Sequence, residues 1–140
     1  MDSLRIDAPI SIGELIDKIT ILEIKGERIA DQYKVANVSK ELALLRAIQA
    51  KAGLDGTEID DYARDLRMVN ATLWDIEDEI RELETRHDFG SRFVQLARAV
   101  YLTNDRRARI KQSINAAFGS DIVEEKSYKG GNAPTSPPGT

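Results

Sequence analysis

Apolar residues recur at helical spacing near the start of the chain. Ser11 opens the sequence SIGE, a capping box in which the serine hydroxyl accepts a hydrogen bond from the amide of Glu14 while Glu14 reaches back. The apolar residues that follow lie three or four apart: Ile12, Leu15, Ile16, Ile19 and Leu22. This pattern predicts a helix from Ser11 to about Tyr33.

Ile21 and Ile24 fall on the opposite side of this first helix. The helix is therefore apolar nearly all round, which is typical either of a central helix or of one that forms a subunit interface. Both alternatives remain open from the sequence.

Two further helices follow. The second is predicted to begin near Asn37 or Ser39, to bury Leu42, Leu45 and Ile48, and to end where Gly53 adopts a left-handed conformation. The third begins at Thr57, which is followed three residues later by the acidic Asp60. Its apolar residues alternate between spacings of three and four: Ile59, Tyr62, Leu66, Val69, Leu73, Ile76, Ile80 and Leu83. That spacing predicts a coiled-coil seam about 30 residues long.

A short break at residues 87–90 separates this seam from a fourth helix, predicted from Phe89 to Phe118 with Asp88 as its cap and Gly119 at its end. Such a short link makes the third and fourth helices an antiparallel hairpin. Charge agrees, because residues 58–88 hold eleven acids and four arginines whereas residues 89–119 hold one acid and six basic residues. We therefore predict an all-α domain of four helices, bundle-like, with a long antiparallel coiled-coil hairpin and with the second helix closing one side.

Three polar residues interrupt the apolar face of the fourth helix. Asn104, Arg107 and Lys111 share that face with Phe93, Leu96 and Val100. An unpaired cation is costly to bury, so Arg107 requires an acidic partner, a water-filled cavity or an anionic ligand. Glu23, on the apolar face of the first helix, is the best candidate partner. The hairpin register sets Asn70 level with Arg107 and Trp74 nearby.

Two interpretations of this cluster remain open. In the structural one, Glu23, Asn70, Asn104 and Arg107 form a satisfied network that fixes the register of the bundle, and Lys111 extends its stem to solvent. In the functional one, Arg107 and Lys111 line a pocket between helices, with Trp74 or Tyr101 as a wall, and bind a small anion.

Composition narrows the class of protein. The 140 residues include no cysteine, which excludes disulfides and thiolate metal sites and makes a reducing cytoplasm the simplest compartment. The net charge of −4 argues against a nucleic-acid binder, and no run of about 18 apolar residues predicts a membrane span. No phosphate loop, dinucleotide fingerprint or zinc-protease motif is present, so we expect neither a metal nor a cofactor, and lone His87 is interpreted as a helix-terminal residue.

The C-terminal part is poor in apolar residues. Residues 130–140 are mostly Gly, Pro, Ser, Thr and Asn, which predicts a disordered tail after a single domain over residues 1–129. The segment before it, GSDIVEEKSYK, is predicted to pack back as an irregular strap anchored by Ile122, Val123 and Tyr128.

Four stretches taken in order carry a family resemblance: IGELIDKITILEIKGERI, LWDIEDEIRELE, YLTNDRRARIK and GSDIVEEKSYK. Together they resemble a family of short bacterial and phage proteins classed only as a domain of unknown function, over about residues 9–129. The resemblance implies a compact, cytoplasmic, helical protein and no particular catalytic activity.

The stretch LIDKITILEIKGERIA is also somewhat similar to the first helix of the all-helical chorismate mutases, in which arginines and lysines from several helices hold a dicarboxylate. Arg28 lies one residue out of that register and the upstream arginine of that family is absent. No catalytic residue is transferred from that resemblance.

The leading functional hypothesis is a non-catalytic binding or assembly module that self-associates, or binds a protein partner, through the Ile21 and Ile24 side of the first helix. The alternative is a protein or enzyme that binds a small carboxylate or phosphate metabolite between the first, third and fourth helices. It would use Asn104, Arg107 and Lys111 with first-helix residues such as Lys18 or Glu23.

Overall fold

The computed structural model describes residues 3–127, which form four helices: α1 (Ile12–Arg28), α2 (Gln32–Lys51), α3 (Thr57–Thr85) and α4 (Ser91–Phe118). No strand occurs within these residues, so the predicted all-α class is confirmed. The predicted tail over residues 130–140 and the predicted anchor Tyr128 lie outside the described residues.

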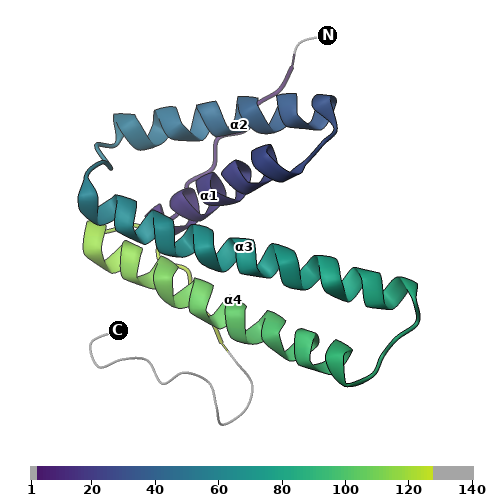
Figure 1. The fold of residues 1–140 in the computed structure, drawn as a ribbon. Helices are drawn as coiled ribbons and strands as arrows, with labels where there is room; N and C mark the ends of the chain where they lie inside the picture. Colours follow the sequence, from purple (N-terminus) through teal and green to yellow (C-terminus); the bar gives the residue numbers. More distant parts are fainter. Residues whose placement is uncertain (1–2, 128–140) are drawn as a thin grey trace.

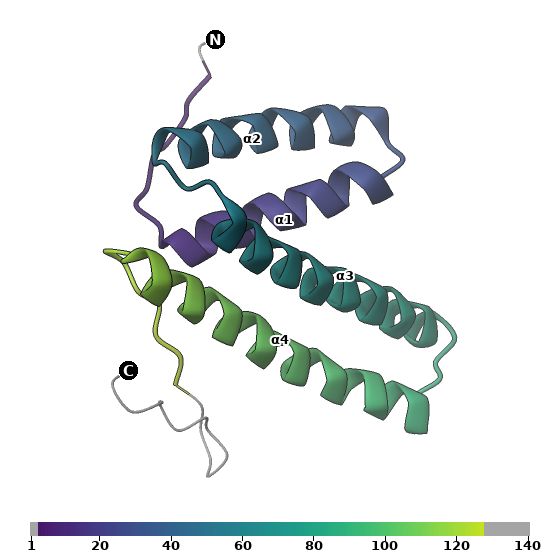
Figure 2. The same ribbon diagram turned by 60° about the vertical axis from the view of Figure 1, so that its left-hand side comes forward.

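Helix α1 is the centre of the fold. It lies between α2 on one side and the antiparallel α3–α4 hairpin on the other (Figures 1 and 2) and contacts all three of the other helices. Helix α2, by contrast, contacts only α1 among the four helices. The all-round apolar character of α1 therefore reflects a central position within one chain.

The N-terminus of α1 follows the capping prediction in part. The Ser11 hydroxyl accepts from the amide of Glu14 at 3.0 Å, but the Glu14 carboxylate turns toward lysines instead of reaching back. The helix ends at Arg28, five residues before the predicted Tyr33, because Asp31 caps a new helix by accepting from the amides of Tyr33 and Lys34. Helix α2 accordingly begins earlier than the predicted Asn37 or Ser39.

Helix α2 is thinly covered. Its apolar residues Val35, Val38, Leu42 and Leu45 are half-buried, and none of its residues is fully buried. The prediction that Ile48 is buried is wrong, since its exposed fraction is 53%. The physical reason is that α2 packs on a single neighbour, which covers only one narrow face.

The α3–α4 hairpin forms the strongest helix pair, as the alternating apolar spacing predicted. Its base, packed on α1, holds the fully buried residues Ile59, Leu66 and Ile114, which form one core cluster with Ile16 of α1. Toward its tip only two helices are in contact. Leu73, Ile76 and Ile80 are half-buried there, whereas Leu83 and Leu96 are buried.

Glycines flank α4 at both ends and follow α2, whereas the predicted cap Asp88 does not cap α4. Helix α4 begins at Ser91 after Gly90, and Asp88 accepts from the amide of Gly90 instead of capping α4. Gly53 after α2 has the predicted left-handed backbone, with φ of 71°, and Gly119, which was predicted to end α4, has φ of 66°.

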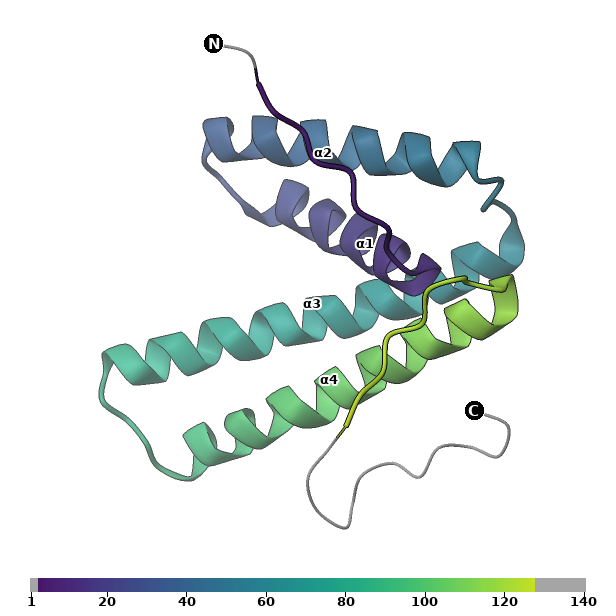
Figure 3. The same ribbon diagram turned by 180° about the vertical axis from the view of Figure 1, so that it is seen from behind.

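Residues 120–127 form the predicted strap, an irregular segment that runs back beside α4 (Figure 3). Its anchors are polar. Ser120 Oγ accepts from the Ile12 amide at 3.0 Å, and Glu124 accepts from the Ser11 hydroxyl at 3.2 Å. Ile122 is half-buried, but Val123 is 52% exposed, so its predicted role as an anchor is wrong.

Candidate functional site

The N-terminal turn of α1 meets α4 at very close range. The amide of Gly13 donates to the Asn115 side-chain oxygen at 2.7 Å, and a Cβ atom at position 13 would lie only 2.5 Å from the backbone carbonyl oxygen of Lys111. Only glycine permits this approach. It brings the polar residues of α4 against α1, and we call the resulting set of ionic contacts the charged seam: Glu14, Asp17, Arg107, Lys111 and Glu124.

Asp17 is the centre of the charged seam. Its side chain is fully buried, and Arg107 donates to both of its carboxylate oxygens through Nε, at 3.0 and 3.1 Å, and to Oδ2 through Nη2. Asn70 of α3 donates to Asp17 at 2.8 Å and to Thr20 at 3.0 Å. A buried carboxylate is tolerated when its charge is paired and its oxygens are hydrogen-bonded, and Asp17 meets both conditions. Three helices are thus joined at one side chain.

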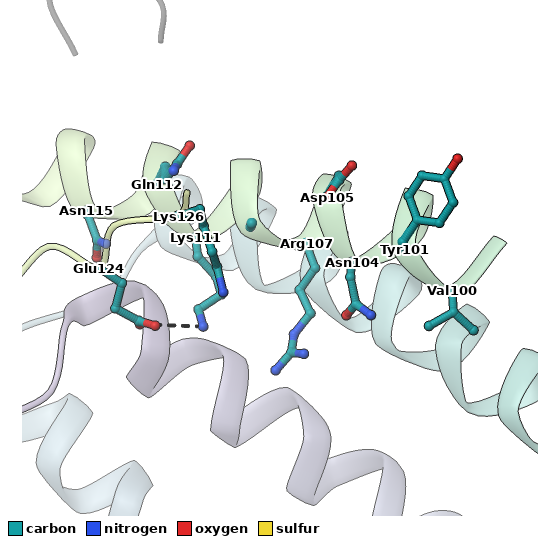
Figure 4. Close-up of a pocket in the computed structure, with 11 residues that line it drawn as sticks. Val100, Tyr101, Asn104, Asp105, Arg107, Lys111, Gln112, Asn115, Glu124 and Lys126 are labelled. Carbon is teal, nitrogen blue, oxygen red and sulfur yellow. Dashed lines mark ion pairs between the residues drawn. The ribbon is translucent and has the colours of Figure 1, made fainter. Parts of the chain in front are cut away.

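Lys111 forms the second part of the charged seam. Its side chain is 13% exposed and pairs with Glu14, with Glu124 at 3.5 Å (Figure 4) and with Asp17 at 3.8 Å. Lys18 lies 3.7 Å from the other oxygen of Glu14. The prediction that Lys111 reaches solvent is wrong, because three carboxylates hold its ammonium group inside the seam.

Two pKa values reflect these contacts. The pKa of Arg107 lies above its ordinary value, first because of the hydrogen bond to Asp17, which outweighs the opposing effect of burial. For Glu124 burial acts to raise the pKa, but the charge of Lys111 and hydrogen bonds from Ser11 and Lys111 together lower it below its ordinary value. Both residues are therefore held in their charged forms near neutral pH.

Glu23 is not the partner of Arg107. It pairs with Arg46 of α2 at 2.7 Å and with Arg67 of α3 at 3.6 Å. Helical periodicity assigned Glu23 to the buried face by counting from Ile19, which presupposes that α1 has a single buried face. Because α1 is covered on both sides, the carboxylate that reaches Arg107 comes from Asp17 instead.

The other predicted site residues separate into two groups. Asn70 belongs to the network around Asp17, as its position level with Arg107 indicated. Trp74 does not join it, and its ring lies under the Arg28 guanidinium at 5.8 Å. Tyr101 and Asn104 are exposed side chains on α4 that line a cavity of about 280 Å³ together with Arg107 and Lys111. The cavity lies between α4 and the strap, not between helices α1, α3 and α4.

The predicted interface residues on α1 are covered within the chain. Ile24 is 2% exposed and Ile21 is half-buried. The prediction that Ile24 offers a free surface is wrong, because the central position of α1 buries it inside the fold.

Sequence reasoning did not single out Gly13, Glu14 as an ion-pair partner, Asp17, Asn115 or Glu124. One signal pointed to Asp17: a helix that is apolar all round leaves no solvent-facing side for the polar residues within it. The roles of Gly13 and Asn115 depend on a contact between segments far apart in the chain, which local spacing does not encode.

The fold and the site together define a class: an all-α protein of four helices whose first and last helices are joined by buried ion pairs. The chain belongs to the family of unknown function DUF6165, whose model matches residues 6–140. No curated protein and no solved structure matches the chain. Among residues 3–127, no helix has both the length and the hydropathy needed to cross a bilayer.

Proposed function

We propose that this protein is a non-catalytic binding and assembly module, and that two copies associate through the outer face of α2. One observation carries the proposal: α2 spans 20 residues, contacts only α1 among the four helices, and has no fully buried residue. Helices draw most of their stability from the packing of an apolar face, and α2 has such packing on one side only. A second packing partner on its outer face would remove that deficit.

The outer face of α2 carries apolar groups suited to such a contact. The exposed fractions are 79% for Tyr33, 38% for Leu44 and 53% for Ile48. These residues lie among the small side chains Ala36 and Ala47, which permit close approach of another helix.

A second copy is the partner that this face fits. Two α2 helices can pack antiparallel through their outer faces with their midpoints at the level of Leu42. Ala36 of each copy then lies opposite Ile48 of the other, so a small residue meets a large one. Tyr33 lies opposite Lys51, which permits a cation–π contact. An isologous contact requires such self-complementarity, and two-fold dimers are the commonest oligomers.

The charged seam supports the non-catalytic part of the proposal. A general acid or base must lie within hydrogen-bond reach of a substrate proton. Here Glu14, Asp17 and Lys111 each direct their charge at a neighbour, and the cost of leaving Asp17 unpaired holds Arg107 in its ion pair.

Light scattering on the full chain tests the assembly. We expect a dimer for the wild type at micromolar concentration and a monomer for Ile48→Glu, because a carboxylate would be buried at the α2 contact. Leu102→Glu is the matched control, since Leu102 on α4 is 50% exposed and lies outside α2. A monomeric wild type, or loss of the dimer in Leu102→Glu as well, contradicts the proposal.

A further inference from the structure

A cavity beside α4 is separate from the proposed α2 contact. It measures about 280 Å³ and is bounded by the α4 residues between Val100 and Asn115 and by Glu124 and Lys126 of the strap. A cavity of roughly 150 Å³ accommodates a benzene ring, so this space has room for a small organic molecule.

One edge of the Arg107 guanidinium faces this cavity. Its Nε and Nη2 atoms are bound to Asp17, which is itself buried and held by Asn70. Its Nη1 atom makes no hydrogen bond within residues 3–127, and the side chain is 28% exposed where it lines the cavity. The Asp17 contact therefore orients the guanidinium and leaves Nη1 as a donor for a ligand.

Asn104 supplies a second donor beside it. Its side chain extends from the same side of α4 as Arg107, whereas Asp105 points to the opposite side (Figure 4). The Asn104 amide makes no hydrogen bond within the described part of the chain. Val100 and Ala108 add apolar wall, and Lys126, which has no ion pair with residues 3–127, adds a positive charge at the strap.

The surrounding charges limit what such a ligand can carry. Asp17, Glu14 and Glu124 already lie around Arg107 and Lys111, and Asp105 also lines the cavity, so a dianion such as a phosphate monoester would be repelled by four carboxylates. Arg107 and Lys111 are already paired, so Lys126 is the one cation of the cavity lining without an ion pair among residues 3–127, and the ligand is limited to a single negative charge. Two separate donors, Arg107 Nη1 and the Asn104 amide, can each bind one oxygen of a carboxylate.

We propose that this cavity binds a small monocarboxylate. The ligand carboxylate accepts from Arg107 Nη1 and the Asn104 amide, and its apolar body packs against Val100 and Ala108. The site does not depend on the α2 dimer, so the test of ligand binding is independent of the test of the proposed assembly.

Nuclear magnetic resonance titrations of the full chain test the site, with acetate, benzoate and cyclohexanecarboxylate as probes. Benzamide is the neutral control for benzoate, and sodium chloride controls for ionic strength. We expect saturable shifts of the Arg107 Nε–H and of the amides near Ala108 with at least one carboxylate, and no saturation with benzamide. Failure of all three carboxylates to saturate, or equal binding of benzamide, overturns the proposal.

Cavity-filling variants locate the binding. Ala108→Phe fills the space without altering Arg107 or Asp17 and should abolish the saturable shifts, whereas Ala97→Phe, an exposed alanine on α4 outside the cavity, should bind as the wild type does. Asn104→Leu removes the second donor and, should Ala108→Phe not fold, provides an independent test by weakened binding. Unchanged binding in whichever of these two cavity variants folds places the ligand elsewhere and overturns the proposal.

Discussion

The two glycines of α1, Gly13 and Gly26, differ in how closely other residues approach them. Gly13 lies under the backbone of α4, whereas a Cβ atom at Gly26 would meet only Val38 Cγ1, at 3.9 Å. A glycine within a helix costs helix propensity, and at Gly26 that cost would be offset only by the close approach of another helix. The close approach occurs at Gly13 instead, because it depends on where α4 crosses α1.

These glycines give a matched pair of predictions. Gly13→Ala should lower the free energy of unfolding by about 1–3 kcal/mol, since the added methyl group collides with the Lys111 carbonyl. Gly26→Ala should raise it by up to about 1 kcal/mol through helix propensity. Urea denaturation of both variants measures the difference, and a Gly13→Ala protein as stable as the wild type would show that α1 and α4 are not in this contact.

The Asp17–Arg107 pair makes a second prediction, on the energetics of a buried ion pair. Arg107→Met alone strands a fully buried carboxylate and should cost about 3–5 kcal/mol, whereas the double variant Asp17→Leu with Arg107→Met should lie within about 2 kcal/mol of the wild type. A double-mutant cycle by urea denaturation gives the coupling. Additive effects of the two single substitutions would mean that the two side chains do not interact in solution.

Among the elements, the sequence predicted best what depends on local spacing. The four helices, their order, the hairpin and the glycine termini after α2 and α4 follow from periodicity and turn residues. The boundary between α1 and α2 was missed because no proline or glycine stands at the break. The break is made by Asp31, which caps α2 within a run of helix-forming residues. The partner of Arg107 was missed because periodicity cannot choose a face on a helix that is covered on two sides.

The strap is an element held by charge, and its attachment should depend on pH. The pKa of Glu124 is lowered in the folded protein, so its contribution to stability is present above the unfolded-state pKa, about 4.3 for a glutamate, and is lost as the pH falls through the lower folded-state value. We therefore expect Glu124→Gln to lower the urea midpoint at pH 7 and to have little effect near pH 3.

Glu125→Gln is the matched control for this pH dependence, because Glu125 is an exposed neighbour without an ion pair among residues 3–127. It should leave the midpoint unchanged at both pH values. A Glu124→Gln effect as large in acid as at neutral pH would contradict the role assigned to the ion pair with Lys111.

For the molecule as a whole, packing is uneven. The base of the hairpin, α1 and the strap pack together and are joined by ion pairs, whereas α2 packs on one neighbour and leaves Tyr33, Leu44 and Ile48 exposed on its outer face. With this uneven packing, α2 is the least covered helix, and a second copy packed on it would cover its outer face. That contrast links the fold to the proposed assembly, because local stability follows local packing.

Amide hydrogen exchange of the full chain at two protein concentrations, one below and one above the dimerisation midpoint, measures this completion of α2. We expect protection of α2 to rise with concentration while protection of the α3 amides near Leu66 stays constant, and we expect Ile48→Glu to remove the rise. Protection of α2 that is independent of concentration would contradict the account.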